Sequence, residues 1–437
     1  MPYMVKINPM KTLSIILLVF VLFSCGGNEP KQVASSKKPQ AKITTPVSNN
    51  YLTYQPSDLK LPDILLVAID AHGDAQLALN HFHYAANQYG FRIIALKNVQ
   101  NNDPKFDAHI QTAIAQATNE FALQQPKIIM AGFSGGARMA LLYAQKHPAA
   151  GVIMLGAGPG KQAVTFHFPL AMISGTRDFN FVEQYYPINS PQVDNPELIT
   201  LHWRGKHAWP DSTSILNALT FVLYRDGQIE ERDINRRAQL AAAKKYKQEK
   251  NIFFYFKQLE LISKTSVGDL QDKATQSIRD IRTSKQANAY FARFNETLKA
   301  EQKRNQYYMQ FLDEKPLDWW QTEIGKLDRL IETEKGVDAD SYARNRAFLG
   351  ILLYSKTNAA IAGRGNAKLL PKYLAVYEML EPENPDVFYF KARYDYILGD
   401  TEAAIKDLKK ALKLGYKDEE KLHQAFPQMI ISQAKTD

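Results

Sequence analysis

The sequence predicts an α/β fold, with a doubly wound and mostly parallel sheet, followed by an all-α region of repeat-like helices. Between residues 55 and 225, short runs rich in Ile, Val and Leu alternate with longer segments of helical character, which is the pattern of parallel strands joined by helices. From Glu230 onward strand signals almost vanish and amphipathic helical segments follow one another. A chain of 437 residues is long enough for each part to have its own core.

The composition excludes several classes of protein. The chain is 45% hydrophobic and 23% charged, which is ordinary for globular material and argues against a polytopic membrane protein or a wholly disordered chain. The net charge is +9, but basic and acidic residues are interspersed, as in residues 230–233 and 406–410. This mixture indicates solvated helix faces, so we expect no nucleic-acid partner.

The first 54 residues predict an export signal and a tether. Lys11 precedes an apolar run at residues 13–23, which is typical of a secretory signal and shorter than the roughly 20 residues that span a bilayer. The run ends in Leu-Phe-Ser-Cys25, which resembles the lipobox of bacterial lipoproteins. We therefore expect a cleaved signal at residues 1–24, a lipid on Cys25, a disordered tether through residue 54, and a lipid-anchored place in the bacterial cell envelope, at the outer membrane or the periplasmic face.

The part of the chain from 55 to 225 contains six strand candidates. Each is a short run of Ile, Val, Leu and Ala, bounded by turn-forming or polar residues. The helical segments between them make parallel pairing the natural arrangement. The candidates are residues 63–69, 91–96, 127–131, 151–155, 169–174 and 198–203.

The third candidate strand enters the motif Gly132-Phe133-Ser134-Gly135-Gly136, and residues 137–145 then read as a helix. G-x-S-x-G between a strand and a helix is the nucleophile elbow. Its glycines allow a strained turn that lifts the serine hydroxyl above the sheet at the helix N-terminus. Ser134 is therefore the predicted nucleophile, and the backbone N–H of Gly135 is the predicted first donor to an oxyanion.

A serine nucleophile needs a base that is oriented by an acid, in the chain order Ser, Asp or Glu, His. Asp178 follows the strand at 169–174 and is the predicted acid, with Asp194 as the alternative. His207 lies after the last strand and before a helix that begins near Asp211, and is the predicted general base. His202 lies within that strand and is expected to be a packing residue.

The second oxyanion donor is expected in the loop after the first candidate strand. We assign it to the backbone N–H of Asp74, with Gly73 as the neighbouring alternative and His72 as a structural residue. The remaining histidines show no metal-ligand grouping with Cys or carboxylates, so we expect no metal and no organic cofactor. Among these histidines are His81, His83, His109 and His147.

Together these elements resemble the α/β-hydrolase superfamily, in particular small esterases of the dienelactone-hydrolase and polyhydroxybutyrate-depolymerase type. The resemblance implies a carboxylic-ester hydrolase that acts on a small or medium ester through an acyl-enzyme. The segment after Asp178 is short, so no lid is expected. The domain is also short, so we expect no counterpart of the first antiparallel strands of larger members. The resemblance depends on His72-Gly73, residues 132–136, residues 175–178 and residues 205–210.

The region from 226 to 437 predicts helices, among them residues 235–262, 343–354 and 369–380. Phe388, Ala392, Gly399, Ala404, Leu408 and Ala411 have spacings that resemble a tetratricopeptide repeat near residues 382–416. Such a region can bind a protein partner. We expect its aromatic residues at 253–255 and 319–320 to belong to the hydrophobic core and not to line a binding groove. Two alternatives to the esterase therefore stay open, namely a peptidase of the prolyl-oligopeptidase type and a non-catalytic envelope scaffold.

Overall fold

The computed structural model describes residues 48–101, 103–160, 166–186 and 188–436. Cys25, the signal segment and most of the expected tether lie outside these residues. The described chain forms one sheet of seven strands in the order β1-β3-β2-β4-β5-β6-β7, in which only the edge pair of β1 and β3 is antiparallel. The strands are β1 (Tyr51–Tyr54), β2 (Ile64–Ile69), β3 (Arg92–Leu96), β4 (Lys127–Phe133), β5 (Gly151–Leu155), β6 (Leu170–Gly175) and β7 (Leu198–Trp203).

All six predicted strands are present, with ends that differ by at most two residues. Strand β1 is an addition to the predicted strands, because residues 51–54 fall within the expected tether. This four-residue strand pairs with β3 from Tyr51 opposite Leu96 to Tyr54 opposite Ile93. The sheet thus begins before the expected boundary at residue 55, and it does contain one antiparallel strand.

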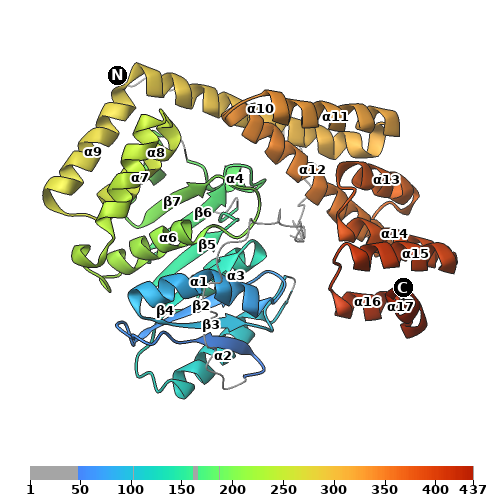
Figure 1. The fold of residues 1–437 in the computed structure, drawn as a ribbon, viewed down its shortest axis with the longest axis horizontal. Helices are drawn as coiled ribbons and strands as arrows, with labels where there is room; N and C mark the ends of the chain where they lie inside the picture. The colour runs from blue at the N-terminus through green and yellow to red at the C-terminus, as the bar shows by residue number, and fades with distance from the viewer. Residues whose placement is uncertain (1–47, 102, 161–165, 187, 437) are drawn as a thin grey trace, which may run out of the picture.

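Helices cover both faces of the sheet, as a doubly wound fold requires (Figure 1). One face packs on α1 (Ala75–Tyr89) and α6 (Ser212–Arg225). The other face packs on α2 (Phe106–Glu120) and α3 (Gly135–Ala144). Two short helices, α4 (Phe181–Gln184) and α5 (Pro191–Asp194), follow β6. We call residues 48–225 the sheet domain.

Residues 226–436 are entirely helical apart from turns, and we call them the helical region. The predicted helix over 235–262 is broken at Lys250, which has a positive φ of 54°. Residues 382–416 contain two helices, α14 and α15, that pack on each other. The helices are α7 (Arg236–Gln248), α8 (Ile252–Lys264), α9 (Gly268–Thr283), α10 (Lys285–Glu314), α11 (Leu317–Thr333), α12 (Val337–Ile361), α13 (Leu370–Leu380), α14 (Pro385–Ile397), α15 (Thr401–Lys413), α16 (Glu419–Ala425) and α17 (Gln428–Lys435), with 3-10 turns at Glu231–Asp233 and Ala367–Leu369.

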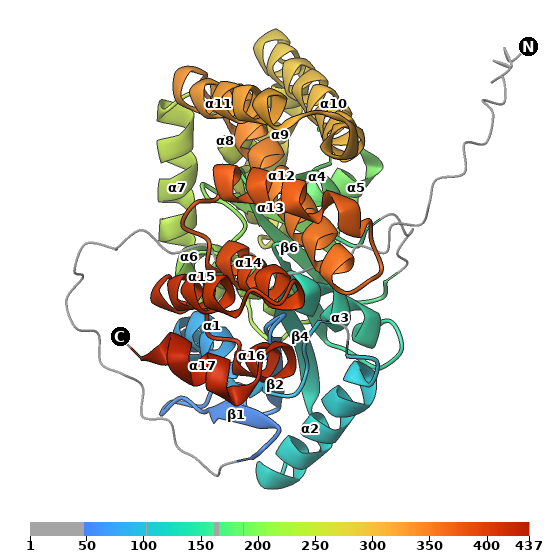
Figure 2. The same ribbon diagram turned by 90° about the vertical axis from the view of Figure 1, so that its right-hand side faces the viewer.

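The helical region forms an arch beside the sheet domain (Figures 1 and 2). It starts with α7 to α9 near β7, continues through α10 to α12, and returns with α13 to α17 facing the sheet domain. Among the described residues, no helix is both long enough and apolar enough to cross a membrane.

An aromatic cluster joins the two parts. Phe181 and Tyr185 of the sheet domain pack against Phe253 of α8 and Phe294 of α10, with ring centroids 4.8–6.3 Å apart. Phe253 is buried in this cluster, and Trp320 is buried in a separate core of the helical region. The aromatic residues at 253 and 320 are therefore core, as expected, and the helical region is packed directly on the sheet domain.

Candidate active site

Ser134 occupies a strained turn between β4 and α3. Its φ of 54° and ψ of −116° are rare for a residue with a side chain. A Cβ atom at Gly132 would lie 2.4 Å from the carbonyl oxygen of Gly136, and one at Gly136 would lie 2.3 Å from the carbonyl oxygen of Ile69. Since these contacts are with backbone, the turn excludes side chains at both positions, as the motif predicted.

Hydrogen bonds connect the three predicted catalytic side chains in the order Ser134, His207, Asp178. The Nε2 atom of His207 lies 3.1 Å from the Ser134 hydroxyl, and its Nδ1 atom lies 2.9 Å from Oδ1 of Asp178. Asp178 is fully buried, and its Oδ1 also accepts a 2.8 Å bond from the backbone N–H of Asn180. The alternative acid, Asp194, instead forms a surface ion pair with Arg282 at 2.8 Å.

Aromatic packing fixes the orientation of the His207 ring. The ring makes tilted contacts with Phe133, at a centroid distance of 4.8 Å, and with Phe179, at 4.4 Å. A Cβ atom at Gly156 would lie 3.3 Å from Cε1 of the imidazole, so the ring also has a close neighbour at its edge. With two aromatic rings and the Gly156 backbone close to it, the His207 ring has little freedom to rotate away from Ser134.

The loops that carry Asp178 and His207 are bonded to each other. We call residues 175–178 the acid loop and residues 203–209 the base loop. The backbone N–H of Thr176 donates to the carbonyl of Trp203 at 2.9 Å, and that of Arg177 donates to the carbonyl of Gly205 at 2.8 Å. These two bonds set the separation of the loops independently of the Asp178–His207 bond itself.

The loop that was expected to supply the second oxyanion donor is organised by Asp70, which the sequence analysis did not single out. Oδ1 of Asp70 accepts from the backbone N–H of His72 at 2.8 Å and of Asp74 at 3.4 Å, and its Oδ2 accepts from the indole of Trp209 at 3.3 Å. Burial raises the pKa of the Asp70 carboxyl and lowers that of His72. Asp70 directly follows the buried parallel strand β2, and this position in the sequence is one that could have marked it as a residue of the site.

Gly135 begins α3 beside the side chain of Asn101. A Cβ atom at Gly135 would lie 1.7 Å from Oδ1 of Asn101, so this side chain lies directly against the helix N-terminus. The side chain of Asp74 accepts a 2.9 Å bond from the N–H of Leu77 and thereby caps α1. Gly135 is the first residue of α3 and Asp74 is the N-cap of α1, and N–H groups at a helix start suit a negative charge.

The other histidines are not part of the hydrogen-bonded chain. His202 is buried, its Nδ1 lies 3.0 Å from the Ser174 hydroxyl, and burial lowers its pKa well below the usual value. His81 stacks on Trp209 with a centroid distance of 4.8 Å. Over the described ranges, no three His, Cys, Asp or Glu side chains come together in a way that would hold a metal ion.

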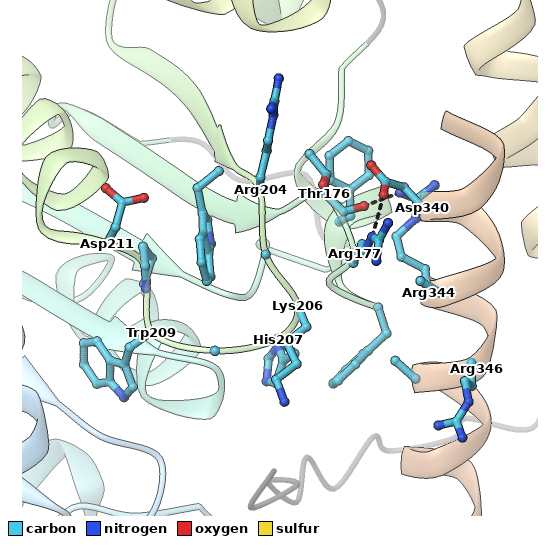
Figure 3. A pocket seen from close by; sticks show the side chains of 18 of the residues that line it. Thr176, Arg177, Arg204, Lys206, His207, Trp209, Asp211, Asp340, Arg344 and Arg346 are labelled. Atoms are coloured by element: carbon cyan, nitrogen blue, oxygen red, sulfur yellow. Dashed lines mark hydrogen bonds and ion pairs between the residues drawn. The ribbon is translucent and has the colours of Figure 1, made fainter. Parts of the chain in front are cut away.

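A cleft of about 1680 Å³ lies beside His207, between the sheet domain and the helical region (Figure 3). Its first wall comes from the base loop and from Phe179, and its second wall comes from α12 and residues 380–384. The described residues after Asp178 include the short helices α4 and α5, and the helical region encloses this side of the site. Sites for drug-sized ligands measure roughly 300–1,000 Å³, so this cleft has room for a larger molecule.

No protein-family model and no curated protein matches this chain. Similar solved structures include an α/β serine hydrolase homologue from Coxiella burnetii, at 15% identity and a TM-score of 0.29 over 36% of this chain and 82% of that one. An α/β serine hydrolase without a lid from Xanthomonas campestris has 14% identity and a TM-score of 0.31 over 40% of this chain and 88% of its own. The esterase domain of a Rhodothermus marinus protein has 12% identity and a TM-score of 0.26 over 38% and 87%.

These similarities cover less than half of the chain, and we take no residue role from them. The sheet order and the strand-turn-helix setting of Ser134 are observed directly in this structure. On these observations, the sheet domain has the α/β-hydrolase fold, and a helix-rich region follows it in the same chain.

Proposed function

We propose that this protein is a serine hydrolase that cleaves carboxylic esters through an acyl-enzyme. The observation that carries the proposal is the unbroken hydrogen-bond chain from Ser134 through His207 to Asp178, behind a strained elbow. A plain structural turn would not need a buried acid and a histidine aligned with the serine. The same chain of contacts favours an enzyme over a non-catalytic scaffold.

The reaction follows from these contacts. Ser134 Oγ attacks the ester carbonyl while His207 Nε2 takes its proton and then passes that proton to the leaving alcohol. Asp178 accepts from His207 Nδ1, which keeps the proton on that nitrogen and stabilises the imidazolium. Water, activated by His207, then attacks the acyl-enzyme and releases the acid. Each step uses side chains and backbone of this chain and needs no metal or organic cofactor.

We assign the oxyanion to the backbone N–H groups of Gly135 and Asp74. Gly135 follows the nucleophile at the start of α3, which is where the developing charge needs a donor. The backbone N–H of Asp74 donates to Oδ1 of Asp70 at 3.4 Å, which is long for an N–H···O bond. Exchanging this weak bond for one to an oxyanion would therefore cost little energy.

The proposed substrate is a small or medium ester, and the cleft of about 1680 Å³ leaves room for a larger acyl or alcohol group beside the helical region. The proposed site of action is the bacterial cell envelope, through a lipid on Cys25, with the helical region available to a protein partner. The peptidase alternative has no specific contact in its favour.

The test is hydrolysis of p-nitrophenyl acetate, butyrate and octanoate by the full chain in mild detergent. Ser134→Ala should lower kcat by at least about 10³-fold. The matched control is Ser174→Ala, which removes a buried serine that bonds His202 outside the hydrogen-bonded chain. Activity in the control and its loss in Ser134→Ala would support the proposal. A parent protein that hydrolyses no ester and does not react with a fluorophosphonate probe would refute it.

A further inference from the structure

Helix α12 of the helical region contacts the acid loop at two points that are one helical turn apart. The Nη1 atom of Arg344 donates a hydrogen bond to the carbonyl oxygen of Thr176. Asp340 accepts a 2.7 Å bond from Nε of Arg177, and this contact is partly open to solvent (Figure 3). The loop that carries Asp178 is therefore attached to a helix more than 150 residues further along the chain.

Arg344 is itself held rigidly. Its Nε lies 3.0 Å from each carboxylate oxygen of Glu301 on α10, and its Nη2 lies 2.7 Å from one of them. Both side chains are almost fully buried, and the guanidinium carbon lies 4.7 Å from the ring centroid of Phe181. Because a guanidinium is planar and its donors have fixed directions, Glu301 determines where Nη1 points.

The position of the Arg344 Nη1 atom can affect Asp178 through the backbone of Thr176. Thr176 is bonded on both sides, since its N–H donates to Trp203 of the base loop and its carbonyl accepts from Arg344. Asp178 lies two residues further along the same loop, and Arg177 between them is bonded to Asp340 of the same helix as Arg344. The Thr176 peptide unit thus connects the base loop, α12 and the acid.

We do not expect the Arg344–Glu301 pair to act mainly by raising the free energy of unfolding. A buried ion pair loses so much hydration that apolar residues of similar volume often replace it with no loss of stability. Its effect is then on geometry, and a displacement of about 1 Å at a catalytic group can lower the rate by about 10²-fold.

We propose that Arg344 is a positioning residue which, held by Glu301, fixes the Thr176 carbonyl and so sets Asp178 against His207. The inference rests on the proposed hydrolase function and extends it. The helical region is by this account part of the active site and not an appended binding module. Arg344 contacts Glu301, Phe181 and the Thr176 carbonyl, so the proposed effect on Asp178 passes through the acid loop.

The test is the double variant Glu301→Leu/Arg344→Met in the full chain, which removes both charges together and leaves neither unpaired. Its matched control is Arg304→Met, since Arg304 also joins α10 to α12, through Asn345 at 2.7 Å and Ser341 at 3.0 Å, without contacting the acid loop. With p-nitrophenyl butyrate we expect kcat to fall 10- to 100-fold in the double variant with KM within twofold. The control should stay within twofold in kcat at a comparable Tm.

A second readout does not depend on turnover. The Nδ1 proton of His207, bonded to Asp178, should give a downfield NMR resonance that is present in the parent and the control and is shifted or lost in the double variant. A double variant with parental kcat and an unchanged resonance would overturn the inference. If the parent neither hydrolyses esters nor reacts with a fluorophosphonate, the hydrolase proposal fails, while the resonance still decides whether Arg344 positions Asp178.

Discussion

Replacing Asp178 by Asn changes one atom of a fully buried group, and the structure gives the size of the effect. Oδ1 of Asp178 accepts from two donors, the N–H of Asn180 at 2.8 Å and Nδ1 of His207 at 2.9 Å. Its Oδ2 is buried with no hydrogen-bond partner among the described residues. If the new amide keeps its oxygen at the Oδ1 position, both bonds survive but the negative charge is lost, and a buried NH₂ group lacks a partner.

If the amide turns instead, its NH₂ group faces His207 and forces the imidazole into the tautomer that carries its proton on Nε2. That tautomer cannot accept the Ser134 proton. Either orientation removes the stabilisation of the imidazolium, so we expect kcat of Asp178→Asn to fall by about 10³- to 10⁴-fold, or about 4–5.5 kcal/mol of transition-state stabilisation. The unpaired amide should also lower the free energy of unfolding by about 1–3 kcal/mol.

The assay is kcat with p-nitrophenyl butyrate, together with urea unfolding of the same preparations. Asp194→Asn is the matched control, because Asp194 is an exposed acid in a surface ion pair, and this variant should keep both its activity and its stability. Retention of more than a tenth of the parental kcat by Asp178→Asn would show that the Asp178–His207 bond does not orient the base, and the reasoning above would be wrong.

Two further predictions concern stability. Gly136→Ala places a Cβ atom 2.3 Å from the carbonyl oxygen of Ile69 and should lower the free energy of unfolding in urea by about 1–3 kcal/mol. The control Gly325→Ala, on α11 with no atom within 4 Å of the new Cβ, should leave that free energy unchanged or raise it. Equal effects of the two substitutions would refute the packing argument. Burial raises the pKa of Asp386 to about 7, so the folded state holds this proton more tightly than the unfolded state and stability should fall as pH rises from about 4 to about 7. The Tm of Asp386→Asn should decline less than that of the parent over this window, and parallel Tm curves would contradict the assignment.

The core of the site could be predicted from sequence because its parts lie at fixed places in the fold. Parallel strands end at one edge of the sheet, so residues just after strand ends meet there even when they are far apart in sequence. Ser134, Asp178 and His207 each follow such a strand, and the structure brings their side chains within hydrogen-bond distance.

The misses have identifiable physical causes. β1 has only four residues, and its pairing with β3 stabilises it more than its own composition does. The helix break at Lys250 carries no Gly or Pro signal. Arg344 and Thr176 are 168 residues apart, and neither belongs to a motif, so their contact follows from how α12 packs on the sheet domain. A contact of this kind depends on the tertiary arrangement and has no local sequence signature.

The aromatic cluster between the two parts has a consequence for biosynthesis. Phe181 and Tyr185 are made more than 100 residues before Phe294, the side chain that helps to cover them. At about 5–20 residues per second, the ribosome leaves this apolar surface uncovered for roughly 6–20 s. A truncated chain that stops at residue 225 would keep it exposed permanently, so such a fragment should aggregate, whereas a chain that continues through α10 should remain in solution.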